Sequence, residues 1–286
     1  MFKASNLKKY SHIKLNFNKF NPLKYSNNII QNNENVEHLV SNHSLVKENI
    51  GLKHFLKRVY IKTGFGVVGS LATASSFTYL LPELLEKHPL ELIVIGAIAS
   101  FGSIFAYNNK DYKIVDKEYQ GVVIPIAEHS AKNKISFATL SVSTGLTMAP
   151  LLLMTNIINP LILPTALILS TATMTGATFY AMKQKDNNIR LWRSALYSGL
   201  TGLIAIGCVS LITYPFFPEV LHLWSTYEPY FGIALFTAMS AYDTQIAIDK
   251  YKNNDFNDLD CAISLFLNFI NLLIRFMEIL AKSQKK

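Results

Sequence analysis

Long apolar segments without a charged side chain recur along this 286-residue chain and alternate with short polar stretches. A bilayer core about 30 Å thick needs about 20 mostly apolar residues for each helical crossing. The uncharged segments match that length or twice it, so the pattern predicts an all-α, polytopic membrane helical bundle. They comprise residues 63–82, 92–109, 135–182, 194–218 and 229–242.

Prolines, asparagines and charged residues mark the ends of six expected transmembrane helices. A last apolar segment, 261–281, contains several polar residues and is either a seventh crossing or a re-entrant helix. The six helices are expected at about 59–81, 90–107, 135–154, 161–182, 194–217 and 230–248.

The basic residues of the connecting segments predict the orientation. Connections after the second, fourth and sixth helices contain eleven Lys and Arg residues, whereas the opposite connections contain Lys87 alone. Because positively charged loops stay on the cytoplasmic side, the N-terminus is expected inside. A seventh crossing would place the C-terminal lysines outside, and a re-entrant helix would keep them inside.

Composition narrows the possible functions. Charged residues make up 16% of the chain, against about 25% in soluble proteins. The net charge is +8, but the basic residues flank apolar segments, so we interpret them as topology signals and lipid contacts and expect no nucleic-acid partner. Cys208 and Cys261 are too few for a disulfide framework or a thiolate metal site, and we expect neither metal nor cofactor.

The chain divides into an extension, residues 1–52, and an expected transmembrane domain, residues 53–286. Residues 1–33 contain six lysines, eight asparagines and no acid. Such a basic leader resembles a mitochondrial presequence, although it lacks arginine. A disordered cytosolic tail is the alternative.

Small residues recur within the expected helices where they would let backbones approach closely. The pairs are Gly66 with Ser70, Ser141 with Gly145, and Gly199 with Gly202. Their spacing predicts a tightly packed bundle and says nothing of its function.

Asp243 is the outstanding candidate for function. It lies seven residues before Lys250, which places it about 10 Å below that charge along a helix. Ionisable groups inside membrane helices are costly and often functional. We therefore expect Asp243 to be neutral or partnered and to respond to pH. The alternative is a carboxylate that reaches the membrane surface at the helix end.

A polar stripe follows in the last segment, where residues spaced by three or four positions share one helix face. Asn268 is expected to donate a hydrogen bond to Asp243, and Arg275 to pair with Glu278 or with Asp243. Lipid disfavours such a face, so it should point into the bundle or a wet cleft. A helix lying on the membrane surface is the alternative. The stripe comprises Ser264, Asn268, Asn271, Arg275 and Glu278.

These two segments carry a family resemblance. AYDTQIAIDKY, followed about twenty residues later by AISLFLNFINLLIRFMEILA, resembles the C-terminal signature of the Bax inhibitor-1 family, the transmembrane Bax inhibitor motif proteins. FLKRVY at 55–60 and NPLILPTA at 159–166 are also similar to that family. The resemblance covers about residues 53–286.

The resemblance implies a seven-segment membrane protein that acts as a pH-sensitive Ca²⁺ leak or exchanger, with Ca²⁺ and H⁺ as permeant or gating ions. In eukaryotes it implies suppression of apoptosis at the endoplasmic reticulum. The growth-hormone-inducible transmembrane branch resides in the mitochondrial inner membrane, which is the alternative location. The family gate is a pair of aspartates; the first matches Asp243, and the second position holds Asn268, which cannot titrate. The family's gating arginine is also absent from residues 92–109.

Two functions remain open from the sequence. One is ion permeation controlled at Asp243; the other is a non-transporting scaffold that regulates through membrane-protein partners. We expect no enzyme, because His-Glu-x-x-His and Gly-x-Ser-x-Gly motifs are absent. The histidines lie in the N-terminal region or in connections, where we expect them to be solvated; they are His12, His38, His43, His54, His88, His129 and His222.

Overall fold

The computed structural model describes residues 22–119, 121–184, 191–213 and 218–284. It divides into two compact units, Met1–Ile50 and Gly51–Lys286. In the first unit, residues 22–50 are helical and begin α1 (Pro22–Leu80). The lysine-rich start of the leader, residues 1–21, lies outside the described residues.

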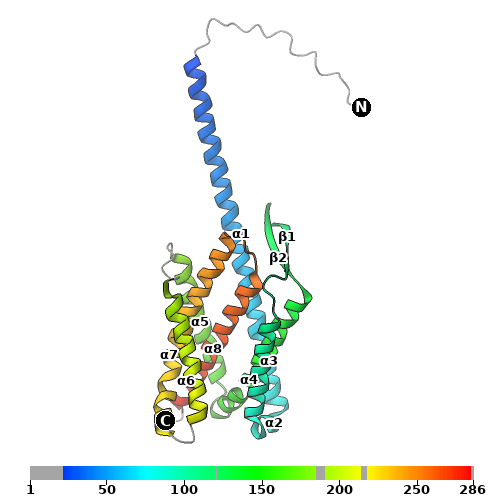
Figure 1. Cartoon of the computed structure of the whole chain (residues 1–286), viewed down its shortest axis with the longest axis vertical. Coiled ribbons are helices and arrows are strands. Elements are labelled where there is room, and N and C mark those ends of the chain that lie inside the picture. The colour runs from blue at the N-terminus through cyan, green and yellow to red at the C-terminus, as the bar shows by residue number, and fades with distance from the viewer. Residues whose placement is uncertain (1–21, 120, 185–190, 214–217, 285–286) are drawn as a thin grey trace, which may run out of the picture. The chain divides into compact units, whose positions relative to one another are not determined.

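The second unit is mostly helical and also contains a β-hairpin (Figure 1). Among the described residues, α3, α4, α5 and α8 are long and apolar enough to cross a membrane. The elements after α1 are α2 (Pro82–Lys87), α3 (Pro89–Ala106), β1 (Tyr112–Tyr119), β2 (Val122–His129), α4 (Ala131–Ile158), α5 (Ile162–Lys183), α6 (Arg193–Thr213), α7 (Pro218–Lys252) and α8 (Asp258–Gln284).

Helix α7 begins earlier than its predicted boundary. The helix begins at Pro218 and continues through Pro229, whereas the sequence predicted a start after Pro229. That prediction was wrong because a proline inside a membrane helix can be tolerated where neighbouring groups satisfy the freed backbone carbonyl. Helix α4 likewise contains Pro150.

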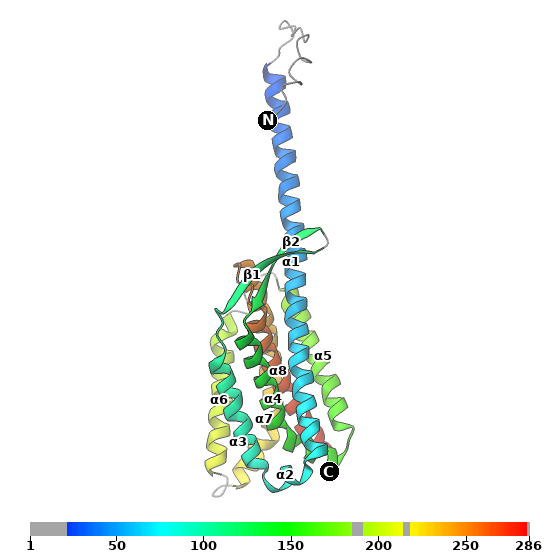
Figure 2. The ribbon, with the colours of Figure 1, turned by 90° about the vertical axis from the view of Figure 1, so that its right-hand side faces the viewer.

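The hairpin is the departure from the all-α expectation. Its strands pair antiparallel from Tyr112 opposite His129 to Tyr119 opposite Val122. At the turn, Gly121 has a φ of 74°, a left-handed conformation that glycine adopts at little cost. Figure 2 shows the hairpin at the end of the bundle where α4 and α8 begin.

Helix α8 is the central element of the bundle. It packs against α4, α5 and α7, and four of its large side chains, Leu265, Phe266, Leu272 and Leu273, are fully buried. Both views show α8 running from the hairpin end to the opposite end (Figures 1 and 2). Its 27 residues span about 40 Å at about 1.5 Å per residue. This length is sufficient for a full crossing, the first of the two alternatives for the last segment.

The seam between α1 and α4 confirms the close approach predicted from small residues. Ser70 Oγ donates to the Ser141 carbonyl at 2.7 Å, and Ser141 Oγ donates to the Gly66 carbonyl at 2.6 Å. A Cβ atom on Gly145 would lie 2.3 Å from the Ser70 carbonyl oxygen. The prediction was wrong for Gly202, whose Cβ position faces open space.

Candidate functional site

The site is centred on a carboxyl–amide pair between α7 and α8. Asn268 Nδ2 donates a hydrogen bond to Asp243 Oδ2 at 2.7 Å. Asn268 is buried, with 3% of its surface exposed, and Asp243 is partly buried. Each polar group satisfies the other between the two helices, where an unpaired polar group would be costly. The structure thus brings together the two residues that the sequence singled out.

The Tyr-Asp-Thr-Gln string, residues 242–245, connects α7 to four other helices. Its tyrosine packs edge-on against Tyr197 of α6, with ring centroids 6.3 Å apart, and its aspartate reaches α8. The threonine hydroxyl lies 2.9 Å from the Tyr60 hydroxyl of α1, which also bonds Thr178 of α5 at 2.8 Å. The glutamine amide donates to the Ala181 carbonyl of α5. This string therefore has a packing role beside any role of its carboxyl group.

Arg275 lies one helical turn or more away from the pair and has other partners. Its guanidinium forms a two-pronged ion pair with Glu228 of α7, at 2.7 and 2.6 Å, and contacts Glu278 at 3.1 Å. A Cβ atom on Gly232 would lie 3.1 Å from Arg275 Nε, so the glycine makes room for this side chain. The expected pairing with Glu278 is present; the alternative bond to Asp243 is absent from the described residues.

The other stripe residues do not join the pair. Asn271 Nδ2 donates to the Leu267 carbonyl of its own helix at 2.8 Å. Ser264 Oγ donates to the Asp260 carbonyl at 3.5 Å. The stripe contacts α7 through Asn268 and Arg275, and α8 packs against three helices of the bundle rather than lying apart from it.

Charges near Asp243 come from the hairpin end of the bundle. Lys250 of α7 and Asp260 of α8 are the charged groups that act on it most strongly. These two form an ion pair with each other, and Lys250 also lies 3.9 Å from Asp255. Their fields at Asp243 therefore partly cancel, which leaves burial and the Asn268 amide as the main influences on this carboxyl group.

Sequence reasoning missed a second polar cluster, around Asp258 at the start of α8. Its carboxylate contacts Arg58 Nε at 2.7 Å, Lys62 Nζ at 2.6 Å and His129 Nε2 at 2.6 Å. The expectation that His129 is solvated was wrong, since it is 5% exposed. His129 is the last residue of β2 in the hairpin, which was not predicted, and there it contacts Asp258 of α8.

The described residues contain no group of three or more His, Cys, Asp or Glu side chains that could hold a metal ion. Cys261 is a buried, free cysteine. The side chain of Cys208 lies outside the described part of the chain.

The fold and the site define a multi-pass helical membrane protein with a polar pair buried between its last two helices. Residues 52–285 match the model of the family described as inhibitor of apoptosis-promoting Bax1. The chain belongs to this family, as its C-terminal signature indicated.

Individual relatives agree with that assignment. Bax inhibitor 1 of Homo sapiens is 28% identical over 231 residues, covering 80% of this chain and 86% of the relative. Probable Bax inhibitor 1 of Paralichthys olivaceus is 25% identical over 230 residues, with 80% and 86% covered. Protein lifeguard 4 of Mus musculus is 26% identical over 234 residues, with 81% and 86% covered.

Proposed function

We propose that this protein is a pH-modulated Ca²⁺ leak whose gate is the Asp243–Asn268 pair. The observation that carries the proposal is the 2.7 Å hydrogen bond between a partly buried acid and a buried amide on adjacent helices. An ionisable group in such a position is expensive, and structural packing alone does not need a carboxyl group there. Ca²⁺ is the cation considered because it prefers oxygen ligands.

The chemistry of the pair sets the direction of the pH effect. An ionised Asp243 accepts a charge-assisted hydrogen bond from Asn268, which is stronger than a bond between neutral groups. Protonation weakens that bond and so loosens the contact between α7 and α8. Ca²⁺ flux should therefore increase as the pH falls.

In this proposal the pH dependence of the flux comes from Asp243 alone, because its neighbours contribute little to it. Asn268 on α8 does not titrate, and the nearest charges, Lys250 and Asp260, compensate each other. On α1, Tyr60 bonds Thr244, the residue that follows Asp243, and a tyrosine ionises only well above neutral pH.

In this proposal the hairpin end of the bundle lies on the cytoplasmic side, because positively charged connections stay on that side. All the long helices of residues 51–284 are proposed to cross the membrane. We further propose that the protein restrains apoptosis, as the names of its relatives imply for those proteins. The endoplasmic reticulum is the proposed location, and the mitochondrial inner membrane is the alternative that the basic leader favours.

Flux through reconstituted protein tests the proposal. The full chain in liposomes loaded with a Ca²⁺ indicator should release or admit Ca²⁺ faster than protein-free liposomes, and Asp243→Asn should abolish the pH dependence. Asp116→Asn is the matched control, since Asp116 is an exposed hairpin residue. Flux equal to that of empty liposomes between about pH 6 and 8 would end the proposal.

Asn268 also favours a second candidate, a scaffold that regulates through membrane-protein partners without transport. An amide at this position cannot share a proton with Asp243, so the pair lacks a coupled titration. If Asp243→Asn abolishes Ca²⁺ flux and cells that express this variant are still fully protected from death, then protection does not depend on transport and the scaffold function is favoured.

A further inference from the structure

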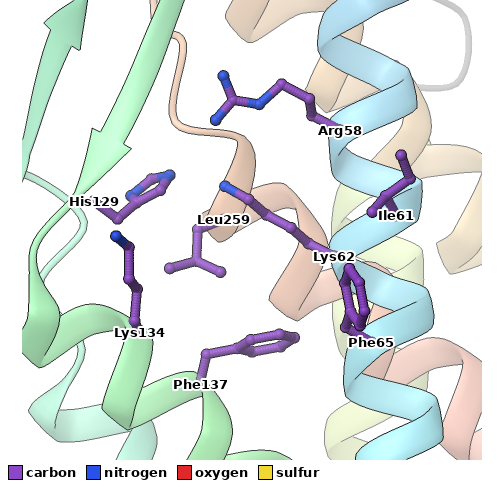
Figure 3. Close-up of a pocket in the computed structure, with 8 residues that line it drawn as sticks. All are labelled: Arg58, Ile61, Lys62, Phe65, His129, Lys134, Phe137 and Leu259. Atoms are coloured by element: carbon purple, nitrogen blue, oxygen red, sulfur yellow. The ribbon is translucent and has the colours of Figure 1, made fainter.

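A pocket opens between α1, α4, the hairpin and the start of α8, away from the Asp243–Asn268 pair (Figure 3). Its volume is about 430 Å³. The basic nitrogen atoms gather in the upper part of the view, and the two phenylalanine rings lie below them. The lining residues are Arg58, Ile61, Lys62, Phe65, His129, Lys134, Phe137 and Leu259.

The polar end of the pocket has an excess of positive charge. Arg58 and Lys62 share the carboxylate of Asp258, which is not one of the lining residues. Lys134 adds a third cation, and none of the lining residues is acidic. Arg58, Lys62 and Lys134 together with the Asp258 carboxylate carry a net charge of +2, and His129 is not included in this count.

Two nitrogen groups at this end have no partner among the described residues, one exposed and one buried. Lys134 is exposed, and its ammonium forms no ion pair with another described residue. His129 Nδ1 is buried and has no hydrogen-bond partner, although Nε2 of the same ring bonds Asp258. An anion in the pocket would attract Lys134 and would offer an acceptor to this nitrogen when it carries a proton.

The lower part of the pocket is apolar and faces outward. Phe65 is 71% exposed and Ile61 is 47% exposed. On both α1 and α4 a lysine precedes a phenylalanine by three residues, as Lys62 and Phe65 and as Lys134 and Phe137. Residues three apart share a helix face, so each helix presents an ammonium followed, one turn further from the hairpin end, by an aromatic ring.

We propose that this pocket binds an anionic phospholipid, with its phosphate between Lys62 and Lys134 and an acyl chain along Phe65 and Phe137. The order of charge and apolar surface matches an amphiphile that enters from the bilayer with its headgroup level with the helix ends. Free phosphate would use the same ammonium groups but would leave the rings uncovered. A zwitterionic lipid would bring its own cation toward the basic residues.

Lipid binding to the purified full chain in detergent, followed by native mass spectrometry, tests the proposal. Dioleoylphosphatidylglycerol should bind about tenfold more tightly than dioleoylphosphatidylcholine, and Lys134→Gln should weaken it about fivefold. Lys132→Gln is the matched control, because Lys132 lies in the same helical turn and borders a different pocket. Both lysines are exposed, so neither change should disturb folding.

The apolar half has its own pair of variants. Phe65→Ala should weaken phosphatidylglycerol binding, whereas Phe101→Ala, which removes a ring on α3 that is 63% exposed, should not. Equal binding of the two lipids, or equal losses in the two lysine variants, would overturn the proposal. Displacement of the lipid by millimolar inorganic phosphate with no effect of Phe65→Ala would assign the pocket to a soluble anion instead. None of these outcomes depends on whether the protein conducts Ca²⁺.

Discussion

Replacing Gly145 with alanine tests the seam between α1 and α4 most severely. The new Cβ atom would lie 2.3 Å from the Ser70 carbonyl oxygen and 2.8 Å from Thr73 Cβ. Both distances are far below van der Waals contact, and the nearest obstacle is backbone, so the two helices must separate. Separation also lengthens the two hydrogen bonds that Ser70 and Ser141 form across the seam.

The magnitude follows from three contributions. Forcing the helices apart costs about 2 kcal/mol, as overpacking commonly does, and weakening two hydrogen bonds adds about 1 kcal/mol each. Alanine returns about 1 kcal/mol because it favours a helix more than glycine does. The free energy of unfolding should therefore fall by about 3 kcal/mol.

Thermal unfolding of the detergent-solubilised protein measures this change. At about 2 to 4 °C for each kcal/mol in a domain of this size, Gly145→Ala should lower the melting temperature by about 6 to 12 °C. Gly176→Ala is the control, because the Cβ position of Gly176 on α5 has no atom within 4 Å. A melting temperature for Gly145→Ala equal to or above that of the control would refute the close approach.

Two further stability predictions concern polar contacts between helices. Asp258→Asn leaves two α1 cations, each about a quarter exposed, without their carboxylate, and should cost about 3 kcal/mol; thermal unfolding should show no comparable loss for Asp116→Asn. Thr244→Val removes the hydroxyl that bonds Tyr60 and should cost about 1 kcal/mol. Thr175→Val, at an exposed threonine bonded to its own helix, should melt like the unmodified chain, and equal losses in both threonine variants would contradict the interhelical bond.

The helices were predictable because a hydrocarbon environment imposes its own length on the sequence. Uncharged segments near 20 residues have few alternatives to a helix in lipid. Their ends were less predictable, since α7 passes through Pro229 and α4 begins at Ala131, before the uncharged segment that starts at residue 135.

The hairpin was missed because its first strand is rich in charged residues, which are typical of a loop. Lys113, Asp116, Lys117 and Glu118 all lie in β1. Strand pairing places Lys113 opposite Glu128, a neighbour of opposite charge that the sequence alone does not indicate. Pro125 also argues against a strand in sequence, but a two-stranded hairpin has only edge strands, which tolerate proline.

The Asp243–Asn268 contact was predictable because Asp243 directly follows an uncharged apolar segment and Asn268 lies on a polar face of the last helix that lipid disfavours. The Asp258 cluster was not predictable, because its members come from α1, β2 and α8 and are far apart in the sequence. His129 lies 129 residues from Asp258, and Arg58 lies 200 residues from it. Charged residues near helix ends are common, and only the fold shows which of them meet. Glu228, the partner of Arg275, was missed for the same reason.

The dependence of Ca²⁺ flux on pH in Asn268→Asp is the most direct test of the proposed gate. Two carboxyl groups within hydrogen-bond distance share a proton because both cannot ionise together, so the variant should respond to pH more steeply than the unmodified protein between about pH 6 and 8. Asn271→Asp makes the same chemical change one turn further along α8, where the amide bonds its own helix, and should leave the profile unchanged. A profile for Asn268→Asp that coincides with that of the unmodified protein would contradict the assignment of this pair as the gate.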